Sequence, residues 1–137
     1  PIESMPVILQ GISTVIPAIA MGNRVVVIPS EKQPFSATDF YQILETSDVP
    51  AGAVNIVTGN KDELANELAK HYDVDGIWYF GSQEGSKNIE LLSTDSMKRS
   101  WVNFGKHRNW LNISHGEGQE FLRHATEIKN IWIPYGA

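Results

Sequence analysis

The stretch that decides the fold is residues 23–34, NRVVVIPSEKQP. Its β-branched run, Arg24 to Ile28, is typical of a strand that is covered on both faces. A helix is expected next, because Ser36 is a good N-cap and apolar residues follow it at helical spacing. Ligands of open α/β sheets bind at the carboxyl ends of the strands, so the turn after Ile28 is a candidate site.

Strand and helix alternate along the chain about every 25 residues, which is the pattern of βαβ units. The sequence therefore predicts an α/β fold, in which a Rossmann-like parallel sheet is flanked by helices. Right-handed crossovers would place every strand-to-helix turn on one edge of that sheet. Further strands are expected at 53–57, 76–80, 100–104 and 128–133, and helices at 6–21, 60–71, 82–92 and 119–125.

Composition excludes several classes of protein. The 137 residues suffice for one folded unit with a core, and the net charge of −5 without a long Lys/Arg run argues against nucleic acid. No apolar run approaches the roughly 18 residues of a membrane span. Neither a membrane partner nor a signal peptide is indicated, so we expect a cytoplasmic protein. The chain starts at Pro1 without Met, as a piece of a longer protein would.

Cysteine and histidine usage limits the chemistry further. The chain has no cysteine, which excludes disulfides, thiolate zinc sites and a thiol nucleophile. Its four histidines show no H-x-x-H spacing, so no metal site is predicted. Trp78, Trp101 and Trp132 fall in expected strands, where packing in a core or an interface is the natural role. Trp110 is expected in a solvated loop.

Three strand-to-helix turns could carry a ligand: IPSE, VTGN and FGSQEGS. Free backbone N–H groups at a helix N-terminus can receive a phosphate, which makes Gly81 and Ser82 candidates. Ser30 lies in the first turn, and the Glu31 carboxylate could accept hydrogen bonds from ribose hydroxyls. The alternatives are a simple helix cap at Gly81–Ser82 and a solvated carboxylate at Glu31.

Three motifs in order resemble the aldehyde dehydrogenase superfamily. Residues 20–31, 50–59 and 76–82 read AMGNRVVVIPSE, PAGAVNIVTG and GIWYFGS. The family shows A-x-G-N-x-V-V-x-K-P-S-E, P-x-G-V-x-N-x-V-x-G and a strand ending in T-G-S. Residues 122–136, LRHATEIKNIWIPYG, are similar to the family's closing oligomerisation strand. The resemblance implies an NAD(P)-binding fold related to enzymes that oxidise aldehydes through a cysteine thiolate.

The residues that this chemistry needs are replaced. Ser4 stands where the family has the Asn that helps bind the oxyanion, and Asn103 stands where it has the general base Glu. An amide does not accept a proton near neutral pH, so no catalytic residue is predicted. Ile28 replaces the lysine of K-P-S-E, which leaves Ser30, Glu31, Gly81 and Ser82 as vestigial cofactor-binding positions. We expect no bound cofactor, with weak NAD binding as the alternative.

The resemblance predicts a degenerate C-terminal second-copy module of a two-module aldehyde dehydrogenase. Its parts would be a Rossmann-like domain at 1–104, an irregular connector at 105–118 in place of the catalytic domain, and an oligomerisation arm at 119–137. The expected role is oligomerisation or scaffolding, with another copy or a dehydrogenase module pairing along 128–133. The alternatives are an NAD(P)-binding regulatory module and a fragment of an active NAD(P)-dependent aldehyde dehydrogenase.

Overall fold

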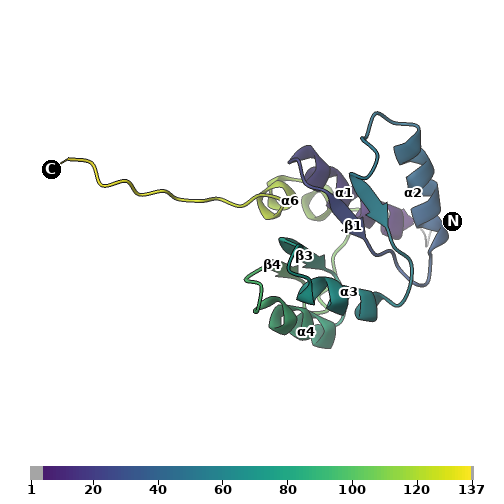
Figure 1. The fold of residues 1–137 in the computed structure, drawn as a ribbon. Helices are drawn as coiled ribbons and strands as arrows, with labels where there is room; N and C mark the ends of the chain where they lie inside the picture. Colours follow the sequence, from purple (N-terminus) through teal and green to yellow (C-terminus); the bar gives the residue numbers. More distant parts are fainter. Residues whose placement is uncertain (1–4, 137) are drawn as a thin grey trace.

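The structure is a computed structural model that describes residues 5–136, with side chains from residue 10 onward. Helices and strands alternate through most of the chain, which confirms the α/β class (Figure 1). The elements are α1 (Met5–Ala20), β1 (Val25–Val27), α2 (Phe35–Glu45), β2 (Val54–Ile56), α3 (Lys61–Lys70), β3 (Gly76–Tyr79), α4 (Gln83–Ser93), β4 (Arg99–Val102), α5 (Ile113–Gly116) and α6 (Gln119–His124).

The strands are parallel, as the βαβ pattern predicts, and they form two separate pairs. β1 pairs with β2, with Val26 opposite Asn55, and β3 pairs with β4, with Trp78 opposite Trp101. Within the described residues, no ladder joins the two pairs into one sheet. Each crossover is made by a helix, α2 in the first pair and α4 in the second, as parallel pairing requires.

Two clusters of buried side chains hold these pairs. The first lies around β1 and β2 and includes Val15, Leu44 and Val54. The second lies between β3 and the helices α3 and α4; its buried members are Ala65, Ala69, Ile77, Tyr79 and Ile89. Ile28, the residue after β1, packs against this second cluster and thereby links the two halves of the body. The position that holds a lysine in the family motif is thus used for packing.

The start of α2 differs from the prediction. Ser36 was expected to cap this helix, but the N-cap is Pro34, with no side-chain hydrogen bond, and Ser36 lies inside the first turn. Proline suits the start of a helix because its φ, here −66°, is already helical and its missing N–H would have no partner there. The start of α3 follows the prediction: Asn60 Oδ1 accepts a hydrogen bond from the Glu63 N–H at 3.0 Å.

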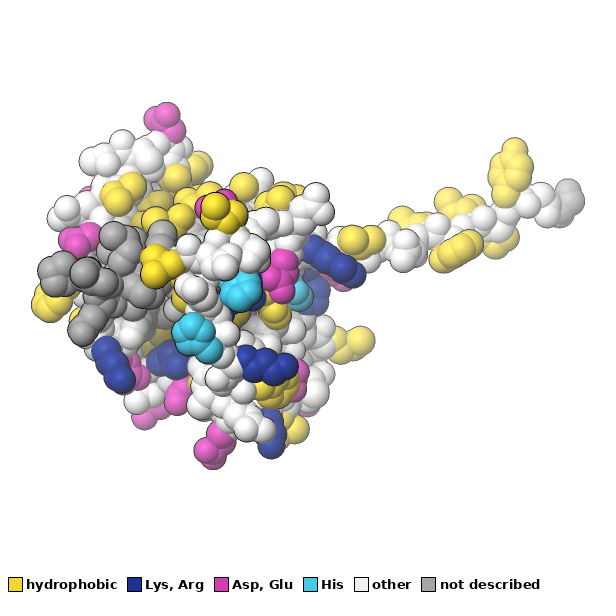
Figure 2. Space-filling model, turned by 180° about the vertical axis from the view of Figure 1, so that it is seen from behind, with side chains coloured by type: hydrophobic (Ala, Val, Ile, Leu, Met, Phe, Trp, Pro, Cys, Tyr) yellow, Lys and Arg dark blue, Asp and Glu magenta, His cyan; other side chains and the backbone are white. Residues whose placement is uncertain are grey.

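The C-terminal strand expected at 128–133 is not formed within the described residues. Residues 127–136, called the tail below, run away from the body as an extended segment without a partner (Figures 1 and 2). A β-strand is defined by backbone hydrogen bonds to a neighbouring strand. Within the described residues, this segment has no such neighbour. Trp132, which was expected to pack, is 92% exposed.

The root of the tail is fixed. Asn23 Nδ2 donates to the Ala125 carbonyl at 2.8 Å, and the Arg99 guanidinium donates to the Thr126 carbonyl. These donors come from the turn between α1 and β1 and from β4, so they join both halves of the body to the end of α6. The tail therefore leaves the body from a defined point. Among residues 5–136, no helix has the length and apolar character that crossing a bilayer demands.

Candidate functional site

Glu31 lies in the turn after β1 and contacts α3. Its Oε1 accepts a hydrogen bond from the backbone N–H of Lys61 at 2.6 Å. Lys61 is the first residue of α3, where free N–H groups and the helix dipole favour a negative charge. Ser30 closes the same turn, because its carbonyl accepts from the Gln33 N–H at 3.1 Å. The carboxylate thus joins the β1 turn to α3.

Asn103 ties the turns after β3 and β4 together. Its Oδ1 accepts from the Gly81 N–H at 3.0 Å, while its Nδ2 donates to the Lys106 carbonyl at 2.9 Å. This arrangement needs a side chain that both donates and accepts, which an amide does and a carboxylate does not. Asn103 is therefore a structural element of the two turns.

Ser82 caps α4, which was the alternative reading of the Gly81–Ser82 motif. Its Oγ accepts from the Gly85 N–H at 3.0 Å, and its carbonyl accepts from the Ser86 hydroxyl at 2.9 Å. Ser86 is fully buried and also accepts from the Phe104 N–H at 3.1 Å. The first turn of α4 is thus bound to the segment after β4 by a continuous set of hydrogen bonds.

Tyr79 packs over the start of α4, which the sequence analysis did not anticipate. Its hydroxyl donates to Asp62 Oδ1 of α3 at 2.8 Å. A Cβ on Gly85 would lie 2.1 Å from the Tyr79 hydroxyl oxygen, and one on Gly81 2.6 Å from it. Burial raises the pKa of Tyr79 and the hydrogen bond to Asp62 raises it further, while Ser82 lowers it. The sequence signal was the pair of glycines on either side of Ser82.

The predicted cofactor positions lie in turns that are partly occupied by internal hydrogen bonds. Three N–H groups at these turns already have protein acceptors: that of Gly81 is bound by Asn103, that of Gly85 by Ser82 and that of Lys61 by Glu31. A pocket of about 340 Å³ between α3 and α4 contains two carboxylates and no lysine or arginine. It is lined by Asp62, Asn66, Tyr79, Ser82, Glu84, Gly85, Asn88 and Ile89.

The remaining predicted positions carry less information. Ser4 lies outside the described residues. Among residues 5–136, no group of three or more His, Asp or Glu side chains is placed to hold a metal ion. The structure brings Gly81, Ser82 and Asn103 into one hydrogen-bonded unit. Glu31 contacts the first turn of α3 rather than this unit.

A larger hollow, called the connector pocket below, lies beyond the carboxyl ends of β3 and β4 and measures about 450 Å³. The segment after β4 forms its far side, where the sequence predicted an irregular connector at 105–118. That connector contains the short helix α5, whose N-cap Asn112 accepts from the Ser114 N–H at 2.9 Å. The pocket is lined by Phe80, Trp101, Val102, Asn103, Phe104, Lys106, His107, Arg108, Ser114, His115 and Glu120.

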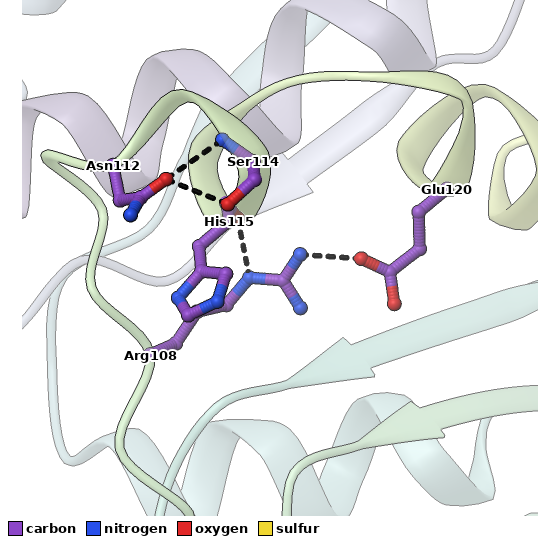
Figure 3. Close-up of polar contacts among 5 residues, drawn as sticks. All are labelled: Arg108, Asn112, Ser114, His115 and Glu120. Carbon is purple, nitrogen blue, oxygen red and sulfur yellow. Dashed lines mark hydrogen bonds and ion pairs between the residues drawn. The ribbon is translucent and has the colours of Figure 1, made fainter.

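Arg108 organises this pocket (Figure 3). Its Nε donates to the His115 carbonyl at 2.6 Å, and its Nη2 pairs with Glu120 of α6. The guanidinium carbon also lies 5.3 Å from the ring centroid of Trp101 and 4.9 Å from that of Phe121, within cation–π range. These contacts hold the connector against α6 and against β4.

Trp110 packs in a cluster of aromatic side chains with Phe80, Trp101 and Phe121, so the expectation of a solvated side chain in a loop is wrong. Its ring lies edge-on to Phe80, with centroids 5.2 Å apart, and 6.3 Å from Phe121. Trp78 and Trp101 contribute as expected, at 5.0 Å from each other. The connector therefore covers the end of the β3–β4 pair with aromatic side chains.

Comparison with known proteins places most of this body in one group. The model of the aldehyde dehydrogenase family matches residues 5–113. The NADP/NAD-dependent aldehyde dehydrogenase PuuC of Escherichia coli is 39% identical over 90 residues, which cover 65% of this chain and 18% of PuuC. Betaine aldehyde dehydrogenase of Bacillus subtilis is 33% identical over 98 residues, which are 72% of this chain and 20% of that protein.

Solved structures agree with these relatives. AldC of Pseudomonas syringae, in complex with NAD⁺ and octanal, superposes with a TM-score of 0.64 and 34% identity over 66% of this chain and 19% of its own. The aldehyde dehydrogenase of Bartonella henselae gives 0.63 and 32%, over 66% and 19%. The chain thus spans about a fifth of the length of these proteins. The family match ends at residue 113, before α6 and the tail.

Proposed function

This chain belongs to the aldehyde dehydrogenase family, and from that premise we propose that it is a non-catalytic module that assembles through its tail. The partner is another copy of the chain or a catalytic aldehyde dehydrogenase module. The lack of cysteine removes the family's nucleophile from this chain. Asn103, at the general-base position, is engaged in hydrogen bonds to Gly81 and Lys106.

The observation that carries the proposal is the exposure of the tail. Large apolar side chains on both of its faces lie in solvent, together with an unpaired extended backbone. Such a segment favours strand addition to the sheet edge of another chain, which satisfies its N–H and C=O groups. Burying one such side chain stabilises a complex by roughly 1.5–3 kcal/mol. The exposed side chains are Ile128, Ile131, Trp132, Ile133 and Tyr135.

The order of residues defines what the partner must offer. In an extended segment, Ile131 and Ile133 point to one face and Trp132 to the other, so both faces need apolar cover. Pro134 has no N–H and ends the ladder. The hydrogen bonds at Ala125 and Thr126 hold the start of the tail on the body. An edge strand with an apolar layer on each side is the expected receptor.

Light scattering after size exclusion tests this assembly. The full chain is expected to elute above its monomer mass of 15.3 kDa, alone or mixed with an active aldehyde dehydrogenase of the same organism. Removal of residues 127–137 should abolish the complex, and Trp132→Lys should weaken it strongly. Lys129→Ala in the same segment is the matched control. A monomer under every condition, at high protein concentration, would rule the proposal out.

The non-catalytic part of the proposal has its own assay. The chain is expected to form no NADH from aldehyde and NAD⁺ above a buffer blank, and Asn103→Glu should not create activity without a thiol. The alternative of an NAD(P)-binding regulatory module is tested by calorimetry with NAD⁺ and NADH, where we expect no saturable heat. Binding that Glu31→Ala or Ser82→Ala removes would instead favour that alternative.

A fragment of an active dehydrogenase is the second candidate, favoured by the share of 18% that the chain covers of an enzyme such as PuuC. The parent protein decides between the two. A parent that keeps full aldehyde oxidation after deletion of this segment, but loses its oligomer, supports the scaffold. A parent that keeps its oligomer and loses NAD⁺ binding supports the fragment.

A further inference from the structure

We propose that the connector pocket binds a small organic anion, a carboxylate carried on an aromatic or other apolar body. This pocket is a different part of the molecule from the tail. Three of its features indicate the ligand: its apolar walls, its excess of cationic side chains and its size.

The walls are aromatic and held in place. Phe80 follows β3 and Trp101 lies near the carboxyl end of β4, and their rings meet edge to face with centroids 5.2 Å apart. Phe121, which is fully buried, lies 5.3 Å from Trp101 on the other side. Phe104 and Val102 complete the apolar lining. A planar apolar ligand would therefore meet the accessible parts of aromatic and aliphatic side chains, which is the usual make-up of ligand pockets.

The polar lining has an excess of cationic and protonatable groups. Lys106, His107, Arg108 and His115 line the pocket against one carboxylate, Glu120, which is paired with Arg108. Among the side chains described, from residue 10 to 136, Lys106 has no salt bridge. This local balance contrasts with the chain's net charge of −5. Figure 2 shows histidine side chains beside lysine and arginine on one face of the body.

Arg108 adds directed donors. Its hydrogen bond to the His115 carbonyl and its pair with Glu120 fix the plane of the guanidinium. A guanidinium has five N–H donors, so these two contacts leave others available for a carboxylate in the pocket. The ammonium of Lys106 is a mobile second charge on the same lining. The two cations can hold one carboxylate while its apolar body lies against the rings.

Size and charge together select the ligand class. A volume of about 450 Å³ is within the range of small-molecule pockets. An inorganic phosphate would use the cations and leave the rings uncovered, whereas a neutral aromatic would use the rings and leave the cations unpaired. The α3–α4 pocket provides the internal contrast, because its charged side chains are the carboxylates Asp62 and Glu84. The same anion is not expected to bind there.

The test is a titration of the full chain followed by ¹H–¹⁵N NMR, with benzoate as the probe and benzamide and inorganic phosphate as matched probes. Benzoate is expected to saturate, with shifts at the Trp101 indole and at the amides of 104–108. Benzamide and phosphate should each bind at least about tenfold more weakly, since each lacks one of the two contacts. Lys106→Ala should weaken benzoate about fivefold to tenfold, and Lys129→Ala should not change it.

Each outcome is decisive. Equal affinity for benzamide and benzoate would show that the carboxylate charge does not contribute to binding. Equal affinity for phosphate and benzoate would show that the apolar walls do not contribute. Shifts centred on Asp62 and Asn88 would place the ligand in the α3–α4 pocket and overturn the assignment, as would an unchanged affinity in Lys106→Ala. Truncation at residue 127 is expected to leave benzoate binding intact, so failure here and failure of tail-mediated assembly are separable.

Discussion

The body of this protein and its tail carry the same kinds of side chain in opposite environments. Phe121 of α6 is 0% exposed among Trp78, Trp101 and Trp110, whereas Trp132 of the tail is 92% exposed. The two lie eleven positions apart in the chain. The difference is the availability of a partner surface: α6 lies against β4 and the connector, while the tail leaves the body at Thr126 and meets nothing within the described residues.

The comparison shows that apolar side chains favour burial, and that the topology decides whether a surface in the same chain is available to bury them. In the body, the strand pairs, their crossover helices and the connector bury these side chains within one chain. The apolar side chains of the tail are left exposed and can be buried only by another molecule. The experiments below break or sharpen this contrast, from the largest expected effect to the smallest.

Phe121→Ala should have the largest effect. Removing a fully buried phenyl group from the aromatic cluster leaves a cavity, and such changes cost about 3–5 kcal/mol. Urea unfolding of the full chain, diluted until light scattering reports a monomer, measures it. Trp132→Ala in the same chain under the same conditions is the matched control and should shift the free energy of unfolding by less than about 0.5 kcal/mol. Similar losses from both changes would mean that the tail packs on the body in solution.

Gly85→Ala is expected to destabilise the body by about 1–3 kcal/mol through overpacking. The new Cβ would lie 2.1 Å from the Tyr79 hydroxyl oxygen and 2.7 Å from the carbon that bears it. Thermal unfolding of the single and double variants measures the effect. Combining the change with Tyr79→Phe should recover part of the loss, since the closest atom is removed. A gain in stability from Gly85→Ala alone would show that Tyr79 does not lie on this turn.

Asn103→Ala should cost about 1–2 kcal/mol, because it removes hydrogen bonds that join the turns after β3 and β4. Asn103→Asp is expected to cost a similar amount, since a carboxylate does not donate to the Lys106 carbonyl. Asn130→Ala, in the exposed tail, is the matched control and should be neutral. Chemical denaturation reports all three. A neutral Asn103→Ala would contradict the structural role assigned to this side chain.

The smallest effect is expected from the protonation of His124, which stacks on Trp101 with ring centroids 3.9 Å apart. Burial lowers the pKa of His124 below its ordinary 6.5; Glu120 raises it, and Arg123, Arg108 and Arg99 lower it. The unfolded chain therefore binds the proton at a higher pH. Stability should fall as the pH drops from 6.5 through the lowered pKa, because protonation then favours the unfolded state.

His124→Phe keeps an aromatic ring against Trp101 and removes the titrating group. The pH dependence of the free energy of unfolding, measured from neutral to mildly acidic pH, should be shallower in this variant than in the parent chain. His107→Gln, at an exposed histidine, is the control for a general loss of imidazole. A slope that His124→Phe leaves unchanged would assign the acid sensitivity to other groups.

Particular elements show how far sequence reasoning reaches. The run Arg24–Ile28 and the spacing of later strands were sufficient to predict β1 to β4, because periodicity and β-branching act locally. The start of α3 near Asn60 was predicted for the same reason. The cap of α2 at Pro34 was missed, since Ser36 offered a competing local signal. The strand at 128–133 was predicted from local propensity, but within the described residues this segment has no neighbouring strand with which to form a ladder.

The residues of the candidate site were also predictable only in part. Gly81, Ser82 and Asn103 were singled out from motifs, yet their use as mutual hydrogen-bond partners is visible only in three dimensions. Tyr79 was not identified at all, because its role depends on the approach of β3 to α4. Arg108 and Glu120 are separated by a connector whose path no local rule predicts, so the connector pocket could not be located from sequence.

The amino-acid sequence by itself determined the α/β class, the parallel βαβ order and the absence of a thiol for aldehyde chemistry, because these follow from residue type and short-range spacing. The tertiary structure alone decided which N–H groups are already satisfied, where cations and aromatic rings face a common hollow, and which apolar segment is left without cover. Those properties depend on contacts between residues far apart in the chain, and such contacts are fixed by packing of the whole body.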